Sequence, residues 1–327
     1  MKQASLPRFG YVAIIGPANA GKSTLLNNLV EDKVSIVSSK PHTTRQKILG
    51  IKTISSAKAK GVDCLHGQIA FVDTPGFAHT IKRGSLKEVL TRSLKDAVRE
   101  GDVTVLVLDS SRIDDDNSLK LALGESEKFI KNTPHVVVLN KIDLKPRAQA
   151  LTAIQIVEKY FRKADSEKIP EIIPVSAVKK LNIDRLLEVI LKLLPEGEIV
   201  FPVDKTTDQT DKFFISELIR EKVFVKMREE IPYSTAVMVE KIKHTKGLMT
   251  VNASIIVEKE GQKGIIIGKG GQALKAIGTE IRLELEEIYA TKVNLQLSVK
   301  VEKNWGETEK GIRKVIGEIG ELNVKES

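Results

Sequence analysis

The chain has 327 residues, enough for about two domains that each bury a hydrophobic core. Its 52 lysines and arginines exceed its 43 aspartates and glutamates, and the resulting net charge of +9 suggests a polyanionic partner such as a nucleic acid or an anionic membrane surface. A single cysteine excludes an internal disulfide and a cysteine-based zinc site, and no segment approaches the roughly 18 apolar residues of a membrane span. We therefore expect a cytoplasmic protein that is at most peripherally attached to the inner face of the cell membrane.

A phosphate-binding loop is predicted close to the N-terminus. Residues 16–23 fit the pattern G-x-x-x-x-G-K-[ST], follow an apolar run at residues 11–15 and lead into a helical segment at residues 24–30. Backbone N–H groups of such a loop point at phosphate oxygens, with a helix N-terminus behind them. Lys22 would contact the β- and γ-phosphates, and the Ser23 hydroxyl would bind Mg²⁺. The predicted nucleotide-binding residues of the loop are Gly16, Pro17, Ala18, Asn19, Ala20, Gly21, Lys22 and Ser23.

The polar stretch at residues 31–46 is a candidate switch loop. Its composition alone is typical of a surface loop. In a P-loop switch protein, however, a threonine of this loop binds Mg²⁺ and contacts the γ-phosphate, so that the loop is ordered only by the triphosphate. Thr43 and Thr44 are both candidates for this catalytic role. We assign Thr44 as the Mg²⁺ ligand, with Thr43 as the alternative.

A second motif that is expected to lie near the phosphates follows a predicted buried strand at residues 68–72. Its residues are Asp73, Thr74, Pro75 and Gly76. An aspartate at this strand end would lie near Mg²⁺, and the glycine N–H would lie near the γ-phosphate. The next residue, Phe77, stands where many GTPases have the glutamine that orients the attacking water. Since phenylalanine has no group for this task, we expect slow nucleotide turnover without an activator.

A base-recognition motif follows the predicted strand at residues 135–139. It consists of Asn140, Lys141, Ile142 and Asp143. A carboxylate can accept hydrogen bonds from guanine N1–H and the 2-amino group together, whereas adenine offers neither donor. Asn140 would contact the base and brace the phosphate loop, and the Lys141 stem would pack along the ring. After one more strand, the backbone N–H groups of Ser176 and Ala177 could reach guanine O6, so the predicted nucleotide is GTP.

The order of these segments predicts an α/β, doubly wound P-loop GTPase domain at residues 1–194, with its site at the carboxyl ends of the strands. Residues 195–211 are rich in proline and polar side chains and are predicted to form a linker. Residues 212–327 have the order α-β-β-α-α-β, which predicts an α+β type II KH domain with a C-terminal helix.

The predicted KH domain contains a glycine loop between two closely spaced helices. A loop of this kind lets a single-stranded nucleic acid backbone come close, with a helix N-terminus behind it. The candidate RNA-binding residues are Ile267, Gly268, Lys269, Gly270, Gly271 and Lys275. Seven lysines against two acidic residues between positions 241 and 275 strengthen this interpretation. A purely structural helix–turn–helix is the alternative.

Taken over nearly its full length, the chain resembles the Era family of bacterial GTPases, in the TrmE-Era-EngA class. The segments that carry the resemblance are residues 16–25, 41–45, 73–76, 140–143, 217–222, 230–234, 265–271, 277–280 and 303–305. The resemblance implies a GTPase that acts in small ribosomal subunit assembly and holds the 3′ end of 16S rRNA in its KH domain. It also implies peripheral membrane association in some members. Asn19 resembles the loop asparagine that helps to hold an activating K⁺ in relatives, and the alternative is that it merely fits the loop. We expect Mg²⁺ as cofactor and a monomeric protein.

Three other functions remain open at this point. The chain could be a membrane-associated regulatory GTPase whose C-terminal domain binds protein or lipid. It could be an RNA chaperone in which the nucleotide only supports the fold, or a related GTPase that acts on tRNA or the large ribosomal subunit. Our preferred mechanism is GTP-gated RNA binding, in which the switch loops position the KH domain only when triphosphate is bound.

Overall fold

The computed structural model describes residues 6–37, 47–55, 66–77, 85–112, 116–130, 133–163, 169–227, 231 and 234–305. These residues divide into two compact units, the first holding most of residues 6–208 and the second holding residues 209–305 together with residues 36–37 and 85–89. The switch-loop candidates Thr43 and Thr44 and the predicted C-terminal helix lie outside the described residues.

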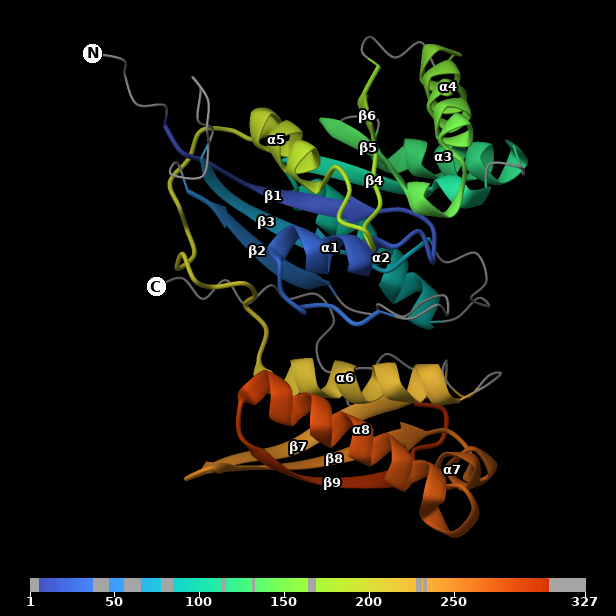
Figure 1. Cartoon of the computed structure of the whole chain (residues 1–327). Helices are drawn as coiled ribbons and strands as arrows, with labels where there is room; N and C mark the ends of the chain where they lie inside the picture. The colour runs from blue at the N-terminus through green and yellow to red at the C-terminus, as the bar shows by residue number, and fades with distance from the viewer. Residues whose placement is uncertain are drawn as a thin grey trace. The chain divides into compact units, whose positions relative to one another are not determined.

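The first unit is built on a six-stranded sheet with the order β2-β3-β1-β4-β5-β6 (Figure 1). Its strands are β1 (Arg8–Ile15), β2 (Ile48–Ile54), β3 (Gly67–Asp73), β4 (Val103–Asp109), β5 (His135–Asn140) and β6 (Glu171–Pro174). Only β2 is antiparallel to its neighbour; the other strand pairs in the sheet are parallel. The central strands are almost continuously apolar and buried, as expected for strands covered on both faces.

Helices cover both faces of this sheet (Figure 1). They are α1 (Lys22–Val30), α2 (Ser85–Glu100), α3 (Asp116–Ile130), α4 (Arg147–Lys163) and α5 (Ile183–Leu193). Helix α1 packs beside α5, and α3 packs beside α4. Because the parallel strands all point the same way, the loops that follow β1, β3, β4, β5 and β6 meet at one edge of the sheet. The predicted doubly wound P-loop fold is confirmed.

The second unit is a three-stranded sheet with helices on one face (Figure 1). Its elements are α6 (Asp211–Lys226), β7 (Ala236–Thr245), β8 (Leu248–Val257), α7 (Glu260–Ile267), α8 (Gln272–Tyr289) and β9 (Lys292–Val301). Strand β8 pairs antiparallel with β7 and parallel with β9. Alternate strand residues such as Val251, Ala253 and Ile255 form the core with apolar residues of the helices. This is the predicted α-β-β-α-α-β order of a type II KH domain.

The segment at residues 195–208 lies along the first unit and bonds to it repeatedly. The Thr206 carbonyl accepts a hydrogen bond from the N–H of Ile51 at 2.7 Å, and the Thr207 hydroxyl donates to the carbonyl of Leu49 at 2.7 Å. Both partners belong to β2, an edge strand, so the segment satisfies backbone groups that the sheet leaves unpaired. Within the described residues, no helix is long and apolar enough to cross a membrane.

Gln68 on β3 holds the segment at residues 195–208 against the sheet through hydrogen bonds. Its buried amide oxygen accepts hydrogen bonds from the N–H groups of Val200 (3.2 Å) and Phe201 (2.8 Å). Its amide nitrogen donates to the Phe201 carbonyl and to the Thr53 hydroxyl, both at 2.9 Å. All four hydrogen bonds are lost if the amide is replaced by an apolar group.

We predict that Gln68→Leu lowers the free energy of unfolding of the first unit by about 1–3 kcal/mol, because polar groups of the segment lose their partner. Urea unfolding monitored by circular dichroism measures the change. Thr53→Val is the matched control, since it removes one of these bonds and leaves the three to residues 200–201; its effect should stay below about 1 kcal/mol. Equal effects of the two substitutions would show that Gln68 does not fasten the segment.

Candidate functional site

The loop between β1 and α1 has the conformation that phosphate binding needs. Gly21 precedes the first turn of α1 with φ +92°, a left-handed conformation. A Cβ atom at Gly21 would lie 2.3 Å from Nδ2 of Asn140, so both the backbone conformation and the close approach of Asn140 require glycine. Asn19 is also left-handed, with φ +64°. These left-handed residues curl the loop tightly in front of the N-terminus of α1, the end of a helix that favours an anion.

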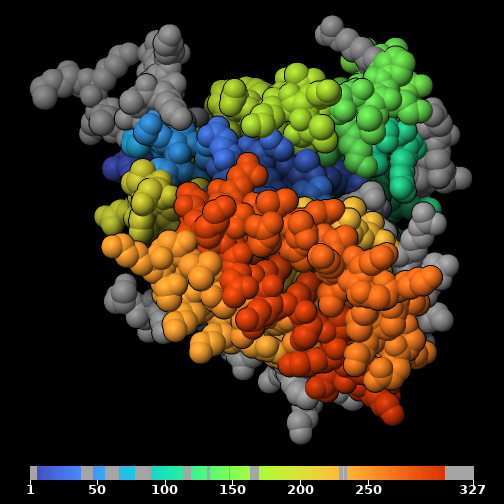
Figure 2. Space-filling view, turned by 60° about the horizontal axis from the view of Figure 1, so that its bottom comes forward, coloured from blue at the N-terminus to red at the C-terminus, as the bar shows by residue number. Residues whose placement is uncertain are grey.

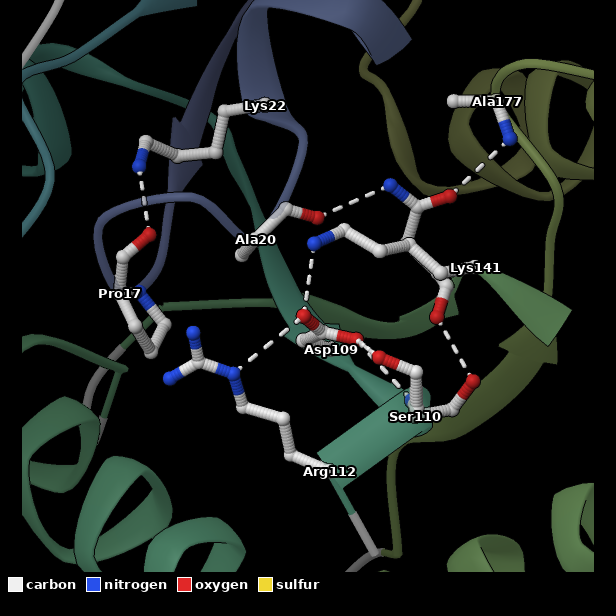
Figure 3. A network of polar contacts seen from close by, with 10 residues as sticks. Pro17, Ala20, Lys22, Asp109, Ser110, Arg112, Lys141 and Ala177 are labelled. Carbon is white, nitrogen blue, oxygen red and sulfur yellow. Dashed lines mark hydrogen bonds and ion pairs between the residues drawn. The ribbon is translucent and has the colours of Figure 1, made fainter. Parts of the chain in front are cut away.

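Lys22 lies folded back on this loop. Its Nζ donates hydrogen bonds to the carbonyl oxygens of Gly16 (3.1 Å) and Pro17 (2.9 Å; Figure 3). Burial lowers the pKa of Lys22 to about 8, while the nearby Asp73 carboxylate acts in the opposite direction. Phosphate oxygens placed in the loop would favour the charged amine and offer it stronger acceptors than the two carbonyls.

Oxygen donors suited to Mg²⁺ lie beside Lys22. The Ser23 hydroxyl donates to Oδ2 of Asp73 at 2.7 Å, and the buried hydroxyl of Ser35 donates to the same oxygen at 3.1 Å. The described residues contain no group of three or more His, Cys, Asp or Glu side chains that could hold a metal. This donor set fits Mg²⁺, which binds to one or two protein oxygens and takes its other ligands from phosphates and water. Ser35 was not identified from the sequence, where it is one of several polar residues after α1.

The residues after Asp73 are held against the phosphate loop. The Thr74 hydroxyl donates to the carbonyl of Ile14 at 2.8 Å. A Cβ atom at Gly76 would lie 2.8 Å from the Ala18 backbone, so the two loops touch at this glycine. Phe77 is buried and its ring stacks on Phe129 of α3, with ring centroids 5.7 Å apart. Phe77 thus contributes to packing and offers no polar group to a water molecule.

Asn140, the last residue of β5, connects three loops through its buried side chain. Its Nδ2 donates to the carbonyl of Ala20 at 2.9 Å, and its Oδ1 accepts from the N–H of Ala177 at 3.0 Å. The same amide therefore ties the phosphate loop to the loop after β6. The predicted contact between Asn140 and the phosphate loop is present.

Asp143 is oriented by Ser176. The Ser176 hydroxyl donates to Oδ1 of Asp143 at 2.5 Å and accepts from the N–H of Lys179 at 3.0 Å. Ile142 begins a short 3₁₀ turn, and its N–H donates to the carbonyl of Val175 at 3.3 Å. The sequence pattern therefore brings together a carboxylate for the guanine edge and the backbone of residues 176–177 next to it.

The proposed RNA loop lies between α7 and α8. Gly268 ends α7 with φ +74°, and a Cβ atom there would lie 2.7 Å from the Cβ of Ala273, so only glycine fits. Lys269 and Lys275 are exposed. Ile267 is partly buried and packs against the core of the unit. Its contact with RNA stays a prediction.

The seven lysines of residues 241–275 do not form one patch. The hairpin lysines are Lys241, Lys243 and Lys246, and the loop lysines are Lys259, Lys263, Lys269 and Lys275. Strand β8 begins at the hairpin tip and ends beside α7, and its ten residues span about 30 Å. Figures 1 and 2 show the hairpin tip and α7 on opposite sides of the unit. The local net charge inferred from the sequence is therefore divided between two surfaces.

Comparison with known proteins assigns the family. A family model described as "50S ribosome-binding GTPase" matches residues 11–141, and one described as "KH domain" matches residues 230–306. GTPase Era of Geobacter metallireducens is 38% identical over 316 residues, which cover 94% of this chain and 97% of that protein. The chain belongs to the GTPase Era family. GTPase Era of Trichlorobacter lovleyi is 41% identical over 300 residues, covering 91% of this chain and 94% of that protein.

Two solved structures of Era proteins support the same assignment. One is an Era variant from Aquifex aeolicus bound to GDP and AlF₄⁻, and the other is Era in complex with MgGDPNP and nucleotides 1506–1542 of 16S ribosomal RNA. Each superimposes with a TM-score of 0.83 at 39% sequence identity and covers 94% of this chain and 98% of its own. Membership of the Era family makes the chain a GTPase, which confirms the resemblance, the fold and the enzymatic activity predicted from the sequence.

We predict that Asp143→Asn changes base preference from guanine to xanthine. The amide can donate to the 2-oxo group of xanthine, whereas guanine loses the acceptor for its 2-amino group, so GDP affinity should fall by about 100-fold or more. Calorimetric titration with GDP and XDP measures both affinities. The control is Asp184→Asn, an exposed carboxylate on α5, which should change neither. Retained preference for GDP would show that another residue reads the base.

Proposed function

We propose that the protein is a GTP-hydrolysing, GTP-gated RNA-binding factor for small ribosomal subunit assembly, and that its KH domain at residues 212–327 binds the 3′ end of 16S rRNA. The observation that carries this proposal is the match to the Era structure with MgGDPNP and nucleotides 1506–1542 of 16S rRNA, which extends over 94% of the chain and thus over both units. The glycine loop between α7 and α8 supports it, because the loop combines a close backbone approach with exposed lysines.

In the proposed nucleotide site, each loop has a separate task. Lys22 binds the β- and γ-phosphates, Gly76 donates its N–H to the γ-phosphate, and Asp143 reads the guanine edge. Ser23 and Asp73 would hold Mg²⁺, which neutralises phosphate charge when bound. Thr44 of the switch loop would be a further Mg²⁺ ligand, and Asn19 would help to hold an activating K⁺.

Hydrolysis is proposed to be slow in the isolated protein. Phe77 stacks on Phe129 and offers no hydrogen bond to an attacking water, so positioning of the water depends on another group or on an activating partner. The triphosphate state would then last long enough to serve as a binding signal. We place this activity in the cytoplasm, with the protein acting as a monomer that is at most peripherally attached to the inner face of the cell membrane.

The two lysine groups of the KH unit allow a sharp test of RNA binding. Lys269→Ala combined with Lys275→Ala should weaken binding of a single-stranded RNA matching the 3′ end of 16S rRNA by about tenfold. The slope of log affinity against log salt concentration should also become less negative by about 1.4, because two phosphate contacts are lost. Fluorescence anisotropy at several salt concentrations measures both quantities.

The matched control for this test is Lys243→Ala combined with Lys246→Ala, which removes the same charge from the hairpin tip. RNA affinity should be nearly unchanged in the control. Equal weakening by both pairs would mean a diffuse electrostatic contact, and no weakening by either would favour a C-terminal domain that binds protein or lipid.

A second candidate is action on the large ribosomal subunit, because residues 11–141 match the family model described as "50S ribosome-binding GTPase". That model covers the nucleotide-binding part only, whereas the relatives that match the whole chain are Era proteins. Competition between the 16S 3′ end and a 23S rRNA fragment of equal length separates the two candidates. Preferential binding of the 16S sequence is expected.

A further inference from the structure

The end of β4 carries a carboxylate directly beside the base-recognition motif. Asp109 is the last residue of β4 and pairs with Asn140, the last residue of β5. Its Oδ2 lies 2.7 Å from Nζ of Lys141 and 3.7 Å from Nε of Arg112 (Figure 3). The side chains of Asp109 and Lys141 are only 12% and 27% exposed, so solvent screens this pair less than it would a surface ion pair.

The two oxygens of Asp109 have different partners. Oδ1 accepts hydrogen bonds from the N–H and the hydroxyl of Ser111, at 3.0 and 2.6 Å, and so fixes the turn after β4. Oδ2 contacts the Lys141 ammonium. One carboxylate group therefore holds both the local turn and a side chain of the neighbouring loop.

The ion pair determines where the Lys141 stem lies. Lys141 has φ +66°, and its Cε passes about 4.0 Å from the position that a Cβ of Gly21 would occupy. The stem therefore extends from the end of β5 past the phosphate loop to the end of β4. A methylene chain held in this way presents an apolar surface between the phosphate loop and Asp143, where the proposed site places the purine ring.

We infer that Asp109 is a positioning residue for the nucleotide base, acting through Lys141. A free lysine side chain gives up much of its rotamer freedom when its stem packs on a ring, and this loss weakens binding. The carboxylate restricts the stem before the nucleotide arrives, so less freedom is lost on binding. This role rests on the proposed GTP site and extends it to a residue outside the base-recognition motif.

Asp109→Asn separates the two functions of the carboxylate. The amide oxygen can still accept from Ser111, so the turn is kept, while the side chain loses the charge that attracts Lys141. Calorimetric titration with GDP and Mg²⁺ should show about tenfold weaker binding, with a melting temperature within a few degrees of the unmodified protein. IDP should weaken by the same factor, because the stem contacts the ring face and IDP differs only at the ring edge.

A double-mutant cycle with Lys141→Met decides whether Asp109 acts through the lysine. Methionine keeps an apolar stem and removes the ammonium, so Asp109→Asn should have less than a twofold further effect in that background. Ser111→Ala, which removes a bond to Oδ1 only, should leave GDP affinity unchanged.

Different results would contradict the positioning role of Asp109 and the proposed GTP site. If the unmodified protein binds no GDP, the GTP site itself is wrong. If the unmodified protein binds GDP and the Asp109→Asn variant binds GDP equally well, the positioning role is contradicted. The role is also contradicted if Asp109→Asn weakens GDP binding by the same factor in the Lys141→Met background as in the unmodified protein. A changed ratio of GDP to IDP affinity would instead place Asp109 at the base edge and would also overturn the inference.

Discussion

The side chain of Asn140 is the interaction on which the nucleotide site depends most. It is buried, and its amide joins the loop after β1 to the loop after β6 through hydrogen bonds to Ala20 and Ala177. The amide has both a donor and an acceptor, which allows one side chain to connect a carbonyl and an N–H on different loops. Gly21 must be glycine because Asn140 occupies the space of a Cβ atom. The geometry of the phosphate loop is thus tied to the strand that carries base recognition.

The same principle of contacts between adjacent strand ends recurs around the site. Asp109 at the end of β4 contacts Lys141 after β5, Ser23 after β1 contacts Asp73 at the end of β3, and Ser176 after β6 contacts Asp143. A parallel sheet makes these contacts possible, since it brings successive loops to one edge. Such cross-loop hydrogen bonds hold the polar groups in place before a ligand arrives, which reduces the cost of ordering them on binding.

The parts of the site that could be predicted from the sequence are those encoded in continuous motifs. Residues 16–23, 73–76 and 140–143 each follow a buried strand, and pattern and strand together predict their placement. Asp109 and Ser35 could not be found in this way, because their partners come from other strands and their own neighbours follow no motif. Gln68 is similar: it lies in an apolar run, and its function depends on a segment more than 130 residues away.

Other differences have equally physical causes. Strand β2 was not predicted, because Gly50 and Lys52 interrupt its apolar pattern and the strand lies at the sheet edge. The lysines of residues 241–275 were counted together as support for RNA binding, but a ten-residue strand separates the hairpin lysines from the loop lysines.

The proposed function couples nucleotide state and RNA binding in one chain. The test measures the affinities for a non-hydrolysable GTP analogue and for GDP, each with and without the 16S 3′-end RNA, and the affinity for the RNA with the analogue and with GDP. We expect RNA to tighten binding of the analogue relative to GDP by at least about fivefold, and the analogue to tighten RNA binding relative to GDP by the same factor, as linkage requires. Equal RNA affinity in the two nucleotide states would show that the two are not coupled.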